Sequence, residues 1–258
     1  MSAQIKVQKQ GNTAVLTMSN PPANTWTEET LKSLTNIVNE LNADKDVYAL
    51  VITGEGEKFF SAGADLNLFA SGDKGVAAQM SQVFGSAFET LSNFRGVSIA
   101  AINGFAMGGG LEVALACDIR IAEEQAQMAL PEAKVGLLPC AGGTQNLSWL
   151  VGEGWAKRMI LCGERLKAEK ACEIGLVEEV VTTGASLDKA LELASQVGDQ
   201  SPVAVSYCKE LIQKGRHGDI TSALPLEREL FVKLFDTQDQ KEGVNAFLEK
   251  RKANWVNG

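Results

Sequence analysis

The sequence predicts an α/β fold that is followed by a group of C-terminal helices. Strand-like and helix-like segments alternate along residues 1–200, and this alternation is typical of α/β architectures. From SPVAV at Ser201 onward the sequence changes to long amphipathic helices with charged faces. These two observations divide the chain into a core at residues 1–200 and a helical module at residues 201–258.

The predicted elements of the core follow one another in a regular order. AVLTM (residues 14–18) and YALVITG (residues 48–54) predict strands, and ETLKSLTNIVNELN between them predicts an amphipathic helix. VSIAAINGFA (residues 97–106) and DIRIA (residues 118–122) predict two further strands on either side of a glycine-led, apolar helix. LVEEVV near Leu176 predicts a late edge strand.

The composition is that of an ordinary soluble protein. The 258 residues are 45% hydrophobic and 22% charged, and no apolar run approaches the roughly 20 residues that span a bilayer. The first ten residues lack the apolar segment of a secretory signal, so we expect a cytoplasmic protein that does not enter a membrane. A formal charge of −8 disfavours nucleic acid as a partner.

Several classes of catalytic centre are excluded by residue counts. The five cysteines have no CxxC spacing, which argues against a disulfide framework or a zinc site. His217 is the single histidine and is expected in a solvated loop at KGRHGD, so neither a multi-histidine metal site nor a Ser-His-Asp triad is expected. No metal is therefore predicted. GEGEKF (residues 54–59) lacks the third glycine of a dinucleotide fingerprint, and no phosphate loop occurs.

Glu112 is a carboxylate within an otherwise apolar stretch, GFAMGGGLEVALACD (residues 104–118). A helix with almost no polar face is buried on all sides. Burial without a partner disfavours the charged form of a carboxyl group and raises its pKa. Glu112 is therefore a candidate general acid or base.

A second carboxylate, Glu132, lies in a comparable setting in MALPEAKVGLLPCAGGTQ (residues 128–145). In KFFSAGADLNLF (residues 58–69), small residues precede a short helix predicted at Asp65, and small residues let a ligand reach backbone N–H groups. Each feature also has a purely structural explanation. Glycines before a helix serve close packing, and a buried glutamate can be an ion-paired core residue.

Taken together, these motifs resemble the enoyl-CoA hydratase/isomerase family, which is also called the crotonase superfamily. The resemblance extends over nearly the whole chain, through NPPANTW, FFSAGADL, NGFAMGGGLEVALACDIRIA, LPEAKVGLLPCAGGTQ, EKACEIGLVEEVV and FLEKRKANW. It implies a crotonase-like spiral of repeated ββα units and a C-terminal module that forms trimers, often paired as hexamers. It also implies an acyl-CoA thioester as the ligand, with coenzyme A as part of the substrate and no separate cofactor.

The resemblance further implies a role for particular residues. The backbone N–H groups of Ala64 and Gly109 would hold the thioester oxygen, and Glu112 and Glu132 match the two catalytic glutamates of hydratases. By the same resemblance, Glu132 transfers the proton at Cα and Glu112 takes the larger share of water activation. Further contacts with the substrate and coenzyme A are expected from Ala62, Asp65, Leu66, Pro131, Cys140 and Lys250.

The sequence departs from the family pattern at two positions. Cys140 stands where many hydratases have glycine, and Asn67 stands where relatives often have a lysine that contacts a coenzyme A phosphate. The tail lysines Lys250 and Lys252 are candidates for the phosphate of a neighbouring subunit, or else favourable charges near the end of the last helix. Cys140 also precedes a predicted helix, and a helix N-terminus can lower the pKa of a thiol and make it a nucleophile.

Three functions remain open on the sequence. The first is hydration of a short 2-trans-enoyl-CoA to a 3-hydroxyacyl-CoA, which the paired glutamates favour. The second is another chemistry of the family, such as double-bond isomerisation, which needs only one glutamate. The third is a non-catalytic homologue that binds coenzyme A or RNA.

Overall fold

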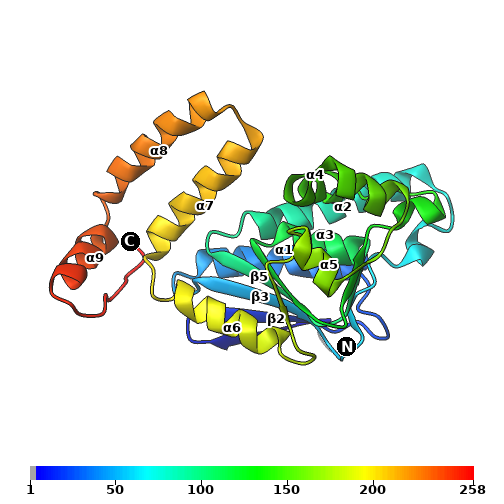
Figure 1. Cartoon of the computed structure of the whole chain (residues 1–258), viewed down its shortest axis with the longest axis horizontal. Helices are drawn as coiled ribbons and strands as arrows, with labels where there is room; N and C mark the ends of the chain where they lie inside the picture. Colours follow the sequence, from blue (N-terminus) through cyan, green and yellow to red (C-terminus); the bar gives the residue numbers. More distant parts are fainter. Residues whose placement is uncertain (1–3) are drawn as a thin grey trace.

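A computed structural model describes residues 4–258 and shows an α/β core with a helical arm that extends from it (Figure 1). The larger sheet of the described core has six strands in the spatial order β1-β2-β3-β5-β7-β10. β1 is antiparallel to β2, and each of the other neighbouring pairs is parallel. The strands of this sheet are β1 (Ile5–Gln10), β2 (Thr13–Met18), β3 (Ala49–Gly54), β5 (Val97–Ile102), β7 (Ile119–Glu123) and β10 (Glu179–Val181).

A smaller sheet lies beside it, in the order β4-β6-β8-β9. Its strands are β4 (Phe59–Ser61), β6 (Phe105–Met107), β8 (Gln127–Ala129) and β9 (Leu166–Lys167). Three successive stretches of chain each supply one strand to the large sheet, the next strand to the small sheet, and then a helix. These units are β3-β4-α2, β5-β6-α3 and β7-β8-α4, so the predicted spiral of ββα units is confirmed.

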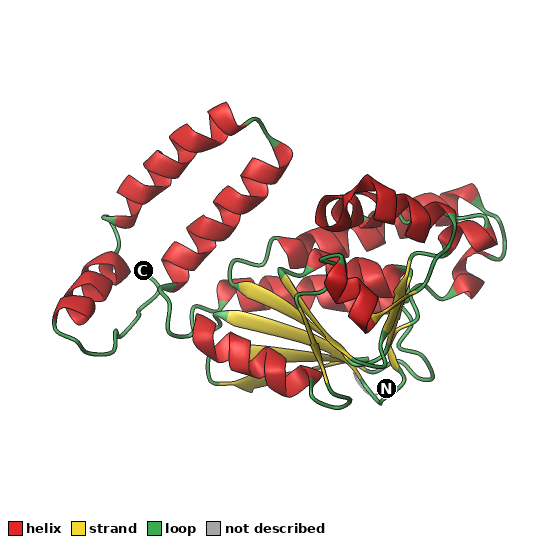
Figure 2. Cartoon of the chain, viewed as in Figure 1, coloured by secondary structure: helices red, strands yellow, loops and turns green. Residues whose placement is uncertain are grey.

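Helices cover both faces of the larger sheet (Figure 2). Within β3, Leu50 and Ile52 join the larger apolar core, whereas Ala49 and Val51 face the smaller core formed with α6. Because successive side chains of a strand point to opposite faces, covering both faces buries every residue of β3. The core helices are α1 (Glu28–Ala43), α2 (Lys74–Ser92), α3 (Gly109–Ala116), α4 (Gly143–Leu161), α5 (Ala168–Glu173) and α6 (Ser186–Val197).

The first helix illustrates how the local sequence sets an element. Thr27 caps α1 because its hydroxyl oxygen accepts a hydrogen bond from the Thr30 N–H, and the Thr30 hydroxyl oxygen accepts one from the Thr27 N–H. Its buried apolar side chains recur at the three- and four-residue spacing of one helix face and join the larger core. These residues are Leu31, Leu34, Val38 and Leu41.

The arm contains α7 (Pro202–His217), α8 (Ile220–Leu234) and α9 (Gln238–Leu248). Ser201 caps α7, and Pro202 occupies the first turn, where its missing N–H costs no hydrogen bond. Lys209 connects α7 to the core because its ammonium lies 2.7 Å from an Asp118 carboxylate oxygen. The division of the chain into a catalytic core at residues 1–200 and a trimerisation module at residues 201–258 stays a prediction.

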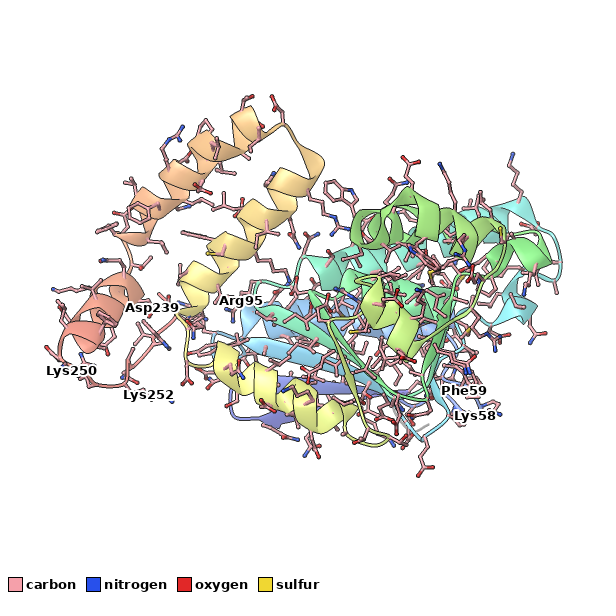
Figure 3. The ribbon with its side chains drawn as sticks, in the orientation of Figure 1. Lys58, Phe59, Arg95, Asp239, Lys250 and Lys252 are labelled. Atoms are coloured by element: carbon pink, nitrogen blue, oxygen red, sulfur yellow. The ribbon has the colours of Figure 1, made fainter. Side chains whose placement is uncertain are left out.

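The tail of the chain packs against the start of α9, near the labelled Asp239 in Figure 3. Asp239 is buried, and its Oδ1 atom accepts hydrogen bonds from the backbone N–H groups of Val256 (2.9 Å) and Asn257 (3.2 Å). The Gly258 carbonyl accepts a further bond from the Gln238 N–H at 2.7 Å. The arm therefore ends in a closed loop.

The structure corrects two local predictions. VSIAAINGFA does not form one strand, because the chain leaves β5 at Ile102 and enters the small sheet at Phe105. KGRHGD is not a loop as far as His217, because α7 continues to that residue and turns at Gly218. The His217 side chain lies outside the described part. The last helix ends at Leu248, and the tail lysines Lys250 and Lys252 follow just beyond it.

None of the helices in the described residues is long and apolar enough to cross a membrane. Within the same residues, no group of three or more histidine, cysteine, aspartate and glutamate side chains is arranged to hold a metal ion.

Candidate active site

The site begins where β6 turns into α3 at the three glycines. Gly108 has φ 54° and ψ −126°, a conformation that favours glycine. A Cβ atom on Gly110 would lie 2.1 Å from the Ser61 carbonyl oxygen, so only glycine lets α3 approach β4 this closely. The glycines therefore place the first turn of α3 directly against the SAGAD loop.

Glu112 projects from the first turn of α3 and is only 3% exposed. Its Oε1 atom accepts hydrogen bonds from the backbone N–H groups of Ala141 (2.8 Å) and Gly143 (2.9 Å). Burial raises the pKa of Glu112 above its ordinary value, and these two hydrogen bonds partly oppose the rise. The predicted pKa shift is confirmed, and the carboxylate is held by one of its two oxygens.

Glu132 begins a short 3₁₀ helix, Glu132–Val135, and faces the same glycine turn. A Cβ atom on Gly108 would lie 3.0 Å from Glu132 Oε1. The Oε2 atom is buried and has no hydrogen-bond partner among residues 4–258. Burial, and to a lesser extent the negative charge of Glu112, raise the pKa of Glu132 to about 7. Near neutral pH this carboxyl group is therefore present in both protonation states.

The two backbone N–H groups predicted to hold the substrate oxygen come close together. A Cβ atom on Gly109 would lie 3.7 Å from the Ala64 nitrogen. Ala64 pairs with Trp26 in a short β-bridge whose hydrogen bonds use the Gly63 carbonyl and the Asp65 N–H, which leaves the Ala64 N–H outside the pairing. Gly109 is the first residue of α3, where an N–H has no acceptor within the helix.

One cavity of about 860 Å³ brings most of the predicted residues together. Its lining is largely apolar, as is usual for a site that binds an organic ligand. Both candidate glutamates and both candidate N–H donors border it. The predicted residues in its lining are Ala62, Ala64, Leu66, Gly109, Glu112, Pro131, Glu132 and Cys140.

Two predicted contacts do not line this cavity. Asp65 instead caps the 3₁₀ helix Leu66–Phe69 and accepts hydrogen bonds from the N–H (3.0 Å) and side-chain amide (2.9 Å) of Asn67. Lys250 lies on the arm, apart from Lys58 and Phe59 on the core (Figure 3). Within one chain Lys250 is not part of the site, and its contact with a neighbouring subunit stays a prediction. Lys252 forms an ion pair with Asp199 at 2.8 Å.

Cys140 lies in the cavity lining but is not an activated thiol. Cys140 is exposed as a whole residue, but desolvation of its thiol by the surrounding protein and the charges of Glu112 and Glu132 raise the pKa of Cys140 to about 11. The alternative of a thiol activated by a helix N-terminus is not supported, because desolvation and two nearby carboxylates raise this pKa. Nucleophilic attack by Cys140 is therefore disfavoured at neutral pH.

The sequence reasoning missed several residues of the cavity. Phe84 reaches it from α2, Met107 from the end of β6, and Arg165 from the turn before β9. Met107 lies within the motif GFAMGGGLEVALACD, directly before the glycines, but was not assigned to the site. No local motif marks Phe84 or Arg165, because they join the site only through packing of distant elements. Leu137 and Leu138 gave one clue to the cavity in the sequence. They are exposed apolar residues in a loop, where polar residues are usual.

Comparisons with known proteins agree with this geometry. A family model described as enoyl-CoA hydratase/isomerase matches residues 8–258. A short-chain-enoyl-CoA hydratase from Clostridium acetobutylicum is 41% identical and aligns over 95% of both chains. A crotonyl-CoA hydratase from Syntrophomonas wolfei is 38% identical over 98% of this chain and 97% of its own length. A solved structure of DspI from Pseudomonas aeruginosa is 64% identical, covers 98% of this chain and 97% of its own, and superposes with a TM-score of 0.96.

Proposed function

The chain belongs to the enoyl-CoA hydratase/isomerase family and is an enoyl-CoA hydratase, and from this premise we propose how its site performs the reaction. The reaction adds water to a short 2-trans-enoyl-CoA and gives a 3-hydroxyacyl-CoA, a step of fatty acid β-oxidation. The observation that carries the proposal is one cavity bordered by two carboxyl groups of raised pKa and two backbone N–H groups.

The N–H groups of Ala64 and Gly109 bind the thioester carbonyl oxygen. Addition of water at the β carbon places negative charge on that oxygen, and fixed backbone donors stabilise the charge without reorganising. One donor in such a hole is typically worth about 3–4 kcal/mol. The close approach of Ala64 and Gly109, which the neighbouring glycines permit, supports this assignment.

The two glutamates divide the proton transfers. Glu112 is fixed by two N–H donors through Oε1, and its other oxygen accepts a proton from the attacking water. Glu132 has a pKa of about 7 and an unpartnered oxygen, so its protonated form delivers a proton to Cα. A general acid or base works best when its pKa lies near the working pH, which favours Glu132 for the proton at carbon.

The substrate is a short acyl chain in this proposal. Two similar proteins are named for short-chain-enoyl-CoA and crotonyl-CoA hydration. Cys140 supports the same size class, because it places a side chain in the cavity lining where many hydratases have glycine.

A panel of enoyl-CoA thioesters tests the proposal through loss of the absorbance of the conjugated double bond. Crotonyl-CoA should lose this absorbance and yield 3-hydroxybutyryl-CoA. An isomerase would instead convert a 3-enoyl-CoA and keep that activity in Glu112→Gln. A binding protein would hold the thioester or RNA without any turnover. Either result, in place of crotonyl-CoA hydration, would contradict the proposal.

We also propose that the arm joins copies of this chain into a trimer or a pair of trimers. Apolar side chains on α8 and α9 are largely exposed in one chain, among them Phe231 (62%) and Phe247 (84%). A group of exposed apolar side chains usually marks a contact surface.

We propose a cytoplasmic location for the protein. Its five cysteines are all free thiols, which supports a reducing compartment.

A further inference from the structure

Besides Glu132 Oε2, three buried polar atoms lack hydrogen-bond partners among the described residues. One is Arg216 Nε, and the other two, on Gln4 and Trp26, lie near each other. Gln4 Oε1 is a hydrogen-bond acceptor and Trp26 Nε1 is a donor. A buried polar group without a partner is costly, so each such atom in a native protein calls for an explanation. Because one atom is an acceptor and the other a donor, a single bridging molecule could satisfy both.

Both residues line the same small cavity, which has a volume of about 10 Å³. A cavity of this size holds about one water molecule, and a buried water needs two to four polar partners. The rest of the lining includes polar residues, so further hydrogen-bonding atoms are close at hand. These residues are Asn20, Asn24, Thr25 and Thr30.

We propose that one structural water bridges Gln4 and Trp26 in this cavity, and that this bridge makes Trp26 a positioning residue for the substrate-oxygen site. The water accepts a hydrogen bond from the Trp26 indole N–H and donates one to Gln4 Oε1. Its second hydrogen donates a hydrogen bond to another oxygen atom of the polar lining. Both orphaned atoms then have partners, and no charge is buried.

Trp26 contacts the protein on both sides of the proposed oxygen site. Its N–H donates to the Gly63 carbonyl at 2.8 Å, and its carbonyl accepts from the Asp65 N–H at 3.1 Å, so its backbone fixes both neighbours of Ala64. Its ring Cδ1 atom lies 3.6 Å from the position of a Cβ atom on Gly109. A shift of the indole would therefore move both N–H donors relative to each other.

The Trp26 ring is 1% exposed and packs edge-on against Phe88, with 5.5 Å between centroids. A hydrogen bond from Nε1 adds a directional restraint to this packing. The effect of Trp26 on catalysis rests on the proposed function, whereas the bridging water does not.

The variants Trp26→Phe and Gln4→Met test the bridge, since each removes one partner. Phenylalanine keeps an aromatic ring but has no N–H, and methionine has about the length of glutamine but no amide oxygen. A crystal structure of the wild-type protein should show one ordered water within hydrogen-bond distance of both atoms, and Trp26→Phe should lose it. A direct Gln4–Trp26 hydrogen bond, or a cavity without water, would overturn the proposal. This measurement stands even if no enoyl-CoA proves to be a substrate.

Kinetics test the positioning role. Each single variant should lower kcat for crotonyl-CoA by about 2- to 12-fold, the equivalent of one ordinary hydrogen bond, with a much smaller change in KM. The double variant should be no worse than Trp26→Phe alone, because both residues act through the same water. The infrared carbonyl stretch of a bound enoyl thioester should move toward its value in water in each variant.

The matched control is Trp149→Phe, which makes the same substitution at a residue that is 56% exposed and borders neither this small cavity nor the active-site cavity. It should leave kcat and the carbonyl stretch unchanged. Additive losses in the double variant, or an unchanged carbonyl stretch in Trp26→Phe, would refute the positioning role.

Discussion

At the scale of single residues, Glu112 and Glu132 have the same side chain in different surroundings. Glu112 is anchored by two backbone N–H groups, whereas Glu132 has one buried oxygen without a partner among the described residues. The anchored group keeps its geometry during the reaction. The other group has a pKa of about 7 and is ready to exchange a proton.

Replacing either glutamate by glutamine should lower hydration by about 100- to 10,000-fold, the usual worth of general acid–base catalysis. The amide keeps the shape of the side chain but cannot transfer the proton, so binding of a saturated acyl-CoA should be nearly unchanged. Steady-state kinetics and calorimetric titration measure the two quantities separately. Near wild-type hydration by Glu112→Gln or Glu132→Gln would show that the altered residue has been assigned the wrong role.

The pH profile should report the proton that the two glutamates share. In the proposed mechanism hydration needs Glu132 protonated and Glu112 ionised, so kcat/KM should fall as pH rises through about 7, where Glu132 loses its proton. The reverse reaction, dehydration, also begins with one proton shared between the two glutamates. Because the overall reaction releases no proton, kcat/KM for hydration and for dehydration should fall with the same apparent pKa. A flat profile across and above neutral pH would place the catalytic proton elsewhere.

Cys140 should set the preference for acyl length. Its side chain lines the cavity, so Cys140→Gly removes volume there and should improve long enoyl chains relative to short ones. One methylene in an apolar pocket is worth about 1–3 kcal/mol, which predicts at least a several-fold change in relative kcat/KM. Thioesters of roughly four, eight and twelve carbons, a spacing chosen to probe pocket depth, provide the comparison. The control is Cys162→Gly, because Cys162 is an exposed cysteine outside the cavity lining. If wild type and Cys140→Gly gave the same ratios of kcat/KM between long and short chains, a steric role for Cys140 would be ruled out.

At the scale of elements, the contact between α3 and β4 decides whether the site forms. Gly110→Ala would place a Cβ atom 2.1 Å from the Ser61 carbonyl oxygen, and backbone on both sides leaves no flexible atom to yield. Such overpacking typically costs about 1–3 kcal/mol and would separate Ala64 from Gly109. We expect lower stability in urea unfolding together with lower kcat.

Gly154→Ala is the matched control for this contact. Gly154 also lies in a helix, but a Cβ atom there would meet no atom within 4 Å. Alanine is favoured over glycine inside helices by roughly 0.5–1 kcal/mol, so this variant should be as stable as the wild type or more so. If Gly110→Ala unfolded at the same urea concentration as Gly154→Ala, the close approach of α3 to β4 would not be as tight as described.

At the scale of the whole molecule, the arm presents apolar residues that its own chain leaves uncovered. Phe247→Glu changes a side chain that is 84% exposed, so the fold of one chain should be unaffected while assembly is weakened. Light scattering should show a trimer or hexamer for the wild type and smaller species for the variant. Val7→Glu, on an edge strand of the core and 44% exposed, should assemble normally. A monomeric wild type at micromolar concentration would exclude the proposed assembly.

The order of the main elements and the placement of both candidate glutamates in apolar surroundings could be predicted from the sequence. Hydrophobic periodicity is a local property, so α1, β2 and β3 follow from their own residues. The apolar surroundings of Glu112 and Glu132 are also local, and they give the correct direction for both pKa values.

Other features were decided only by the tertiary structure. The donors that hold Glu112 lie on Ala141 and Gly143, far along the chain, and no local pattern predicts that pairing. The pKa of Cys140 rises because distant carboxylates and packing outweigh its position before a helix. The sequence by itself determined the main strands and helices and which residues carry ionisable groups into apolar surroundings. Only the tertiary structure decided which backbone N–H groups and carboxylates meet, because electrostatic effects and hydrogen bonds depend on distance in space and not on separation along the chain.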